Sequence, residues 1–211
     1  MRENYKTIGG LTECEMIVQK SRFISYAQRA ESEKEALEFI DSIKAKHRSA
    51  NHNCSAYLIG EHDSVQKAND DGEPSGTAGF PILEVLKKQR LKDTVVVVTR
   101  YFGGIKLGGG GLIRAYGKAT TEAIAAAGVV ERRLHHLMKI SIDYNWLGKV
   151  ENEVRQSGYP LKDIQYTDGV ALLVYVPKEK EHEFTDWIND ITNGQANLDC
   201  LESEFLEFKL A

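Results

Sequence analysis

The sequence contains few cysteines and no cysteine pair of the type that binds metals. Cys14, Cys54 and Cys200 are the only three among 211 residues, and they are odd in number and far apart. No CxxC motif is present. This usage indicates reduced thiols and argues against a disulfide framework or a zinc site.

Long apolar runs are also missing. The run of four valines, residues 95–98, is followed at once by the polar residues Thr99 and Arg100, and no apolar stretch approaches the roughly 18 residues of a membrane helix. The opening residues MRENYKTIGG lack the apolar core of a secretory signal. We therefore expect a cytoplasmic protein that does not enter a membrane.

An excess of positive charge is absent as well. The formal net charge is −4, which argues against a bulk nucleic-acid binder. Residues 1–128 hold 18 Lys and Arg against 16 Asp and Glu, whereas residues 129–211 hold 9 against 15. Of the two parts, the first is therefore the one that could meet a polyanion.

The chain is organised around residues 95–127. Four valines at residues 95–98 predict a buried strand. Glycines follow at residues 103–104 and 108–111, and apolar residues then recur at helical spacing until Gly128. We therefore predict a strand, a glycine-rich loop and a helix, an arrangement that points backbone N–H groups and the positive helix end at one spot.

The sequence lacks the two specific nucleotide-binding motifs that a glycine-rich segment could contain. A Walker loop around Gly117-Lys118 would need glycine at Leu112 and Ser or Thr at Ala119. A dinucleotide fingerprint fails too, because Ile113 or Arg114 stands where its third glycine would be.

Two interpretations of the glycines remain. In the first, the glycines only allow positive φ angles and close packing. In the second, they belong to a surface that also binds phosphate. Flanking basic residues support the second interpretation. Its candidate phosphate- or RNA-binding residues are Arg100, Tyr101, Gly103, Gly104, Lys106, Gly108, Gly109, Gly110 and Arg114.

A second informative stretch, residues 69–81, predicts a structured, exposed loop. Its candidate recognition residues are Asp70, Asp71, Glu73, Ser75, Gly76 and Thr77. Clustered carboxylates suit magnesium or catalysis, but they also cap turns and pair with arginines such as Arg48, Arg100 or Arg114. We favour capping and pairing, because no nucleophile or base completes a mechanism. His52-x-Cys54 has no second ligand pair nearby, so we expect no metal, no cofactor and no catalytic residue.

The remaining pattern predicts an α+β protein of two domains, residues 1–130 and 131–211. In the first domain we expect a hairpin, a helix, two strands and a second helix before the central strand. These elements are predicted at residues 14–18 and 22–28, 32–47, 54–59, 65–68 and 77–89. After Gly128 the pattern reads β-α-β-β-α-β, the ferredoxin-like split βαβ order. Asp168-Gly169 marks its hairpin.

Two motifs together resemble the IMPACT family, which is found in bacteria and eukaryotes. They are Asp70-Asp71-Gly72-Glu73-Pro74-x-Gly76-Thr77-Ala78-Gly79 and Thr99-Arg100-Tyr101-Phe102-Gly103-Gly104-x-x-Leu107-Gly108. The resemblance covers about the first 130 residues and implies a ribosomal protein S5 domain 2-like fold there. The tail is similar to the second domain of bacterial members, which resembles the last, ferredoxin-like domain of elongation factor G.

The resemblance implies a link to translation. Eukaryotic members regulate initiation by competing for the activator of a kinase that senses uncharged tRNA. This two-domain chain resembles the bacterial members, where that kinase pathway is absent, so that role is not carried over. Shared domains with elongation factor G suggest contact with structured RNA, by fold analogy alone.

Three functional hypotheses follow. The first is a non-enzymatic, translation-associated regulator that binds structured RNA or the ribosome through the glycine-rich face, with Tyr101 or Phe102 stacking an unpaired base. The second is an enzyme that acts on a phosphorylated small molecule, as kinases of the S5-like fold do. The third is a protein-interaction module that uses the Asp70–Pro81 loop.

Overall fold

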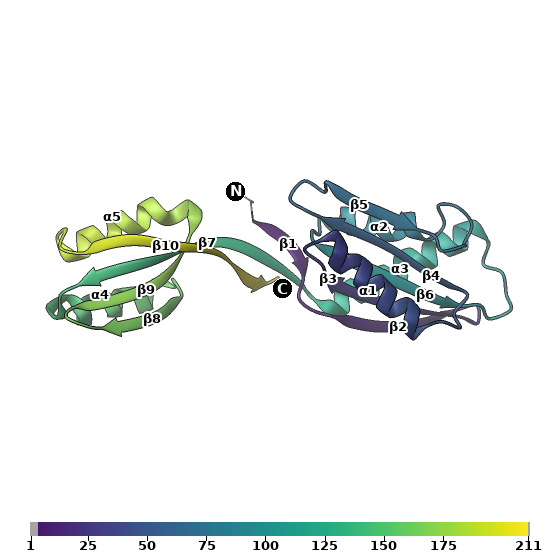
Figure 1. Ribbon diagram of the computed structural model, residues 1–211, viewed down its shortest axis with the longest axis horizontal. Coiled ribbons are helices and arrows are strands. Elements are labelled where there is room, and N and C mark those ends of the chain that lie inside the picture. The colour runs from purple at the N-terminus through teal and green to yellow at the C-terminus, as the bar shows by residue number, and fades with distance from the viewer. Residues whose placement is uncertain (1–3, 211) are drawn as a thin grey trace. The chain divides into compact units, whose positions relative to one another are not determined.

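The computed structural model describes residues 4–210, and the chain forms two compact units (Figure 1). Among the described residues, the first comprises residues 4–132 and 208–210, and the second comprises residues 133–207. We call them the N-terminal and C-terminal units. The sequence-based boundary lies after residue 130, two residues before this division. The return of the last residues to the N-terminal unit has no counterpart in the sequence pattern.

The N-terminal unit is built on a five-stranded sheet with strand order β2-β3-β6-β4-β5, in which all neighbours are antiparallel. Its elements are β1 (Tyr5–Ile8), β2 (Thr12–Val18), β3 (Ser21–Arg29), α1 (Glu33–Lys46), β4 (His52–Ile59), β5 (Val65–Asn69), α2 (Gly79–Lys88), β6 (Thr94–Tyr101) and α3 (Gly108–Ala127). β1 lies outside this sheet and pairs with the start of β7.

Strand β6 is the centre of the sheet, and helices cover both of its faces. Val95 and Val97 belong to the hydrophobic cluster under α1, whereas Val96 and Val98 belong to the cluster under α2 and α3. All four valines are completely buried. The predicted strand is confirmed, and its uninterrupted apolar run follows from burial on both faces.

Most other elements predicted for this unit are present. The hairpin is formed by β2 and β3, whose register pairs Cys14 with Ser25. The predicted first helix is α1, and the hydroxyl of Ser32 accepts a hydrogen bond from the backbone N–H of Glu35 at its start. Strand β4 begins at His52, two residues before the predicted start, so His52 is not in a loop.

The prediction of a loop for residues 108–111 is wrong, because these four glycines form the first turn of α3. Glycine is a poor helix former, but the helix is 20 residues long and is held by a buried face. That face consists of Leu112, Ala115, Tyr116, Ala119, Thr120, Ala123 and Ile124.

Gly103 marks a close approach of two backbones. A Cβ placed there would lie 1.9 Å from the carbonyl oxygen of Lys20, so no side chain fits. Gly104 and Gly108 adopt positive φ angles of 87° and 69°. Gly103, Gly104 and Gly108 therefore do serve close packing or positive φ, just before the helix and at its first residue.

The C-terminal unit follows the order β-α-β-β-α-β, as predicted for a ferredoxin-like domain. Its elements are β7 (Val129–Ile142), α4 (Tyr144–Ser157), β8 (Leu161–Tyr166), β9 (Val170–Pro177), the 3-10 turn η1 (Lys178–Lys180), α5 (Glu181–Thr192) and β10 (Asn197–Lys209). β7 pairs with both β9 and β10, and β8 pairs with β9. Residues of α4 and α5, including Val150 and Phe184, share one buried cluster with the sheet.

Within residues 4–210, no helix has the length and apolar character that a membrane crossing requires.

Two isoleucines of α3 give a matched test of the core. Ile124 is 1% exposed, whereas Ile113 is 46% exposed. We expect Ile124→Ala to lower the free energy of unfolding by about 2–5 kcal/mol, because it leaves a cavity. Ile113→Ala should change it by less than about 1 kcal/mol. Urea denaturation followed by circular dichroism measures both, and equal losses would contradict this packing.

Candidate functional site

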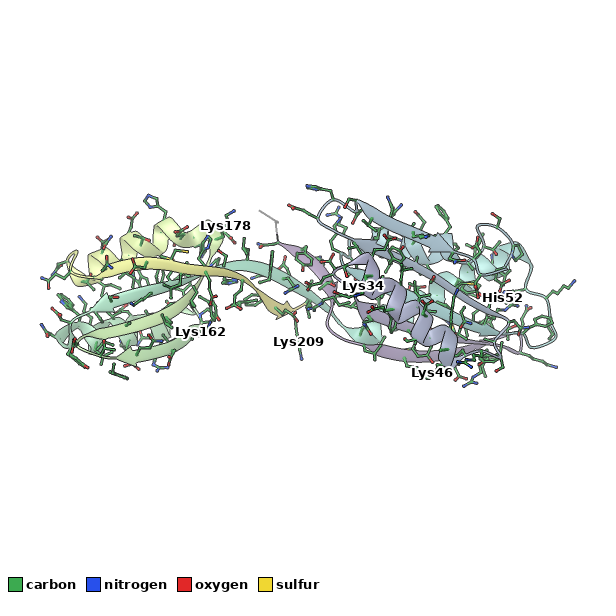
Figure 2. All side chains as sticks on the ribbon, in the orientation of Figure 1. Lys34, Lys46, His52, Lys162, Lys178 and Lys209 are labelled. Carbon is green, nitrogen blue, oxygen red and sulfur yellow. The ribbon has the colours of Figure 1, made fainter. Side chains whose placement is uncertain are left out.

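A cleft of about 450 Å³ lies beside the start of α3 in the N-terminal unit. Three segments that are distant in sequence form its wall. They are the start of β4, the loop of residues 70–78 between β5 and α2, which we call the acidic loop, and the chain from the end of β6 into α3. The lining residues are Asn51, His52, Glu73, Pro74, Arg100, Phe102, Lys106, Leu107, Gly108, Gly109 and Leu112. His52 is labelled in Figure 2.

A buried ion pair forms the floor of this region. Nη1 of Arg100 donates a hydrogen bond of 2.6 Å to Oε1 of Glu73, and the two side chains are only 6% and 3% exposed. Nη2 of Arg100 also donates to the hydroxyl of Ser21 at 3.2 Å. Buried charges are stable only when they are paired in this way, so the end of β6 and the acidic loop hold each other in place.

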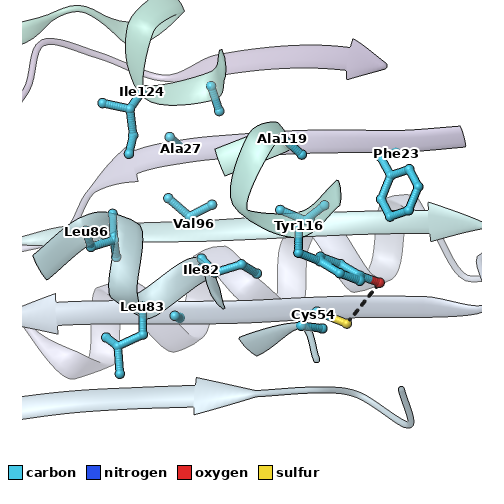
Figure 3. Packing of buried hydrophobic residues seen from close by; sticks show 14 of the residues in the cluster. Phe23, Ala27, Cys54, Ile82, Leu83, Leu86, Val96, Tyr116, Ala119 and Ile124 are labelled. Atoms are coloured by element: carbon cyan, nitrogen blue, oxygen red, sulfur yellow. Dashed lines mark hydrogen bonds between the residues drawn. The ribbon is translucent and has the colours of Figure 1, made fainter. Parts of the chain in front are cut away.

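Helix α3 joins the same network through Tyr116. Its hydroxyl donates to Oε1 of Glu73 at 2.9 Å and accepts from Sγ of Cys54 at 3.3 Å (Figure 3). Burial raises the pKa of Tyr116 and that of Cys54, so both groups keep their hydrogen at neutral pH. Strand, loop and helix are therefore fixed around one carboxylate.

The two aspartates of the acidic loop are used by the fold. Asp70 accepts hydrogen bonds from the backbone N–H groups of Gly76, Ala78 and Gly79, with distances of 2.8–3.0 Å, at the start of α2. Such a position suits a carboxylate because the helix N-terminus carries unpaired donors and partial positive charge.

Asp71 is engaged in a similar way. It accepts from the backbone N–H of Asn53 at 2.6 Å and from Nζ of Lys44 at 3.3 Å. Thr77 donates to the carbonyl of Pro74, while Ser75 and Gly76 are exposed. These contacts favour the capping and pairing interpretation of the loop. Between residues 4 and 210, no group of three His, Cys, Asp or Glu side chains is placed to hold a metal ion.

The predicted phosphate-binding residues separate into two sets. Arg100 is buried and its charge is balanced by Glu73, so it differs from the open phosphate contact that was expected. The hydroxyl of Tyr101 lies 2.9 Å from Nδ1 of His47, and the N–H of Gly103 donates to Ser21. The other candidates, Gly104, Lys106, Gly108, Gly109, Gly110 and Arg114, are exposed.

The start of α3 offers backbone donors to the cleft. No side-chain hydrogen bond caps the helix at Leu107, and the glycines of the first turn bring no side chains of their own. Gly108, Gly109 and Gly110 are exposed. The helix dipole adds partial positive charge there, and Lys106 precedes the turn. This end of the cleft is chemically suited to an anion.

Several cleft or network residues were not identified from the sequence, among them Tyr116, His52 and Asn51. Tyr116 has the spacing of an ordinary core residue, His52 was assigned to a loop, and Asn51 carried no signal. The register of β4 against β6 places His52 opposite Arg100. That long-range pairing is the information that local patterns lack.

Comparison with known proteins agrees with this architecture. Residues 19–124 match the Impact N-terminal domain, and residues 140–195 match a domain of unknown function, DUF1949. The chain is 55% identical to IMPACT family member YvyE of Bacillus subtilis, over 98% of this chain and 95% of that one. The chain belongs to the IMPACT family.

Other IMPACT relatives are more distant. IMPACT family member YigZ of Escherichia coli is 33% identical over 88% of this chain and 92% of its own. The protein IMPACT homolog of Saccharomyces cerevisiae is 36% identical over 42% of this chain and 35% of its own. A crystal structure of a hypothetical protein is similar with a TM-score of 0.61 and 30% identity, covering 96% of this chain and 99% of that one.

The importance of the buried pair is testable. We expect Glu73→Leu to lower the free energy of unfolding by about 3–5 kcal/mol, because Arg100 keeps a buried charge without its partner. The double variant Glu73→Leu with Arg100→Met should be more stable than the single variant, since it removes that charge. Urea denaturation measures both, and a double variant less stable than the single one would contradict this account.

A second test uses the histidine bound to Tyr101. His47 is 9% exposed and its Nε2 lies 2.6 Å from the hydroxyl of Tyr26. Burial, and next the charge of Lys46, lower the pKa of His47. The unfolded chain then binds more protons than the folded chain below about pH 6.5, so this contribution to stability is lost as pH falls.

We therefore expect the loss of stability between about pH 7 and pH 5 to be smaller in His47→Gln than in the parent. His62→Gln is the control because His62 is exposed. Urea denaturation at several pH values measures the slopes. Equal slopes for the parent and His47→Gln would show that His47 does not titrate differently on folding.

Proposed function

We propose that this IMPACT family member is a non-enzymatic, translation-associated regulator that binds structured RNA or the ribosome through the cleft beside α3. Family membership supports a translation-related regulatory role in general. The observation that supports RNA as the ligand is the four-glycine start of α3, which faces a cleft with an exposed lysine and an exposed aromatic ring.

Each part of this surface suits a part of an RNA chain. Backbone N–H groups at the start of α3, together with Lys106 and Arg114, contact phosphates. Phe102 is 45% exposed and offers a ring on which an unpaired base stacks. The guanidinium of Arg100 lies 5.6 Å from the centre of that ring, within the range of a cation–π contact.

The enzyme hypothesis has less support. The carboxylates proposed to hold magnesium accept backbone hydrogen bonds or pair with Lys44 and Arg100. The protein-interaction hypothesis retains one supporting observation, the 55% exposure of Phe80 next to the acidic loop.

The proposal is tested by filter binding of the full chain to ribosomes, tRNA and unrelated duplex DNA over a salt series. We expect preferential, salt-sensitive binding to ribosomes or RNA. Lys106→Ala with Arg114→Ala should weaken binding and reduce the salt slope by about one for each phosphate that the variant no longer neutralises.

The control is Lys34→Ala with Arg155→Ala, which removes the same charge from other surfaces. Lys34 is on α1, on the opposite face of the sheet and well away from His52 (Figure 2), and Arg155 is in the C-terminal unit. The control should bind like the parent.

Absence of RNA and ribosome binding at low salt would refute the proposal. A pull-down from lysate, with and without nuclease, tests the protein-interaction alternative. Protein partners that are captured equally in both would favour that alternative.

A further inference from the structure

We propose that the cleft holds a single unpaired ribonucleotide and recognises its ribose 2′-hydroxyl through Glu73 and His52. This inference rests on the proposed function and specifies which part of an RNA the cleft takes. It goes beyond phosphate contact, because it predicts that the site distinguishes RNA from DNA.

The first observation is an unpaired acceptor on the cleft wall. Oε1 of Glu73 accepts both hydrogen bonds of this carboxylate, from Arg100 and Tyr116. Oε2 forms none with the described residues, and the side chain is 97% buried, with 3% exposed. A carboxylate only accepts, so the group that pairs with Oε2 must be a donor such as a hydroxyl. Glu73 lines the cleft, so a donor bound there can reach this carboxylate.

The second observation is an additional acceptor beside the first. Nδ1 of His52 lies 2.9 Å from the carbonyl oxygen of Asp71, which only accepts, so Nδ1 carries the hydrogen. In the neutral imidazole, Nε2 is then an acceptor. It lies 3.9 Å from Oε2 of Glu73, too far for a hydrogen bond between them. A single hydroxyl hydrogen placed between the two atoms can be shared by both as a three-centre hydrogen bond.

The third observation is that these acceptors and the anion-binding end belong to the same cleft. Tyr116, which reaches Glu73, is seven residues after Gly109, roughly 10 Å along the helix axis. Helical side chains lean toward the N-terminus, so its hydroxyl lies closer to the first turn than its Cα does. Glu73, His52, Gly108 and Gly109 all line this one cleft, so a nucleotide bound there can place its phosphate at the first turn and its hydroxyl at Glu73.

The size of the cleft explains why the nucleotide must be unpaired. Its volume of about 450 Å³ falls in the lower part of the range for small-molecule sites, about 300–1,000 Å³. A single nucleotide fits such a volume, whereas a duplex does not. Phe102 provides the stacking surface that an extruded base requires.

The test compares two oligonucleotides that differ only in the 2′-hydroxyl. Fluorescence anisotropy of the full chain is measured with a labelled uridine octamer and with the deoxyuridine octamer of the same sequence. We expect the ribo-oligonucleotide to bind about tenfold more tightly, the effect of one hydrogen bond to a charged group. His52→Ala and Glu73→Gln should each bring this ratio close to one.

Lys106→Ala is the matched contrast, because it should weaken both oligonucleotides and leave the ratio unchanged. Circular dichroism checks that Glu73→Gln is folded, and His52→Ala carries the test if it is not.

Equal affinities of the parent for the two octamers would overturn this inference, while the proposed RNA-binding function would still stand. A ratio unchanged in both folded variants, or tighter binding of duplex RNA, would overturn it as well. Absence of binding to any RNA or ribosome would overturn the proposed function itself.

Discussion

The buried ion pair between Arg100 and Glu73 is the interaction on which the rest of the site depends. Removing two charges from water is expensive, and the attraction between them compensates only when the geometry is good and further hydrogen bonds are made. Ser21 and Tyr116 supply those bonds. Strand β6, the acidic loop and α3 can therefore adopt only the arrangement in which these four side chains meet.

This constraint determines what the acidic loop can do. Asp70 and Asp71 bind backbone N–H groups at the starts of α2 and β4, so their charge holds the loop in the shape that presents Glu73 to Arg100. A run of carboxylates that resembles a cation site in the sequence is, in the folded chain, a set of caps. The surface left for ligands is the one beside it, at the first turn of α3.

The sequence was informative wherever structure depends on neighbouring residues. The valine run, the capped first helix and the βαββαβ order were predicted from periodicity and turn residues, and the structure confirms them. The sequence was not informative where a residue's position depends on contacts with residues far away in the chain. The glycines were assigned to a loop because their low propensity is local, whereas packing of the helix face is not. His52, Tyr116 and the balanced charge of Arg100 depend on strand register, which no local pattern encodes.

The glycine-rich segment consists of two parts under different evolutionary constraints. The carbonyl of Lys20 forbids any side chain at position 103, whereas a Cβ at position 109 has its nearest neighbour, Cγ2 of Thr77, at 3.8 Å. Gly103 is thus fixed by the architecture alone and would persist in a descendant that had lost every ligand. Gly109, which lines the cleft, has no such obligation, so only selection on the cleft would preserve it over long divergence.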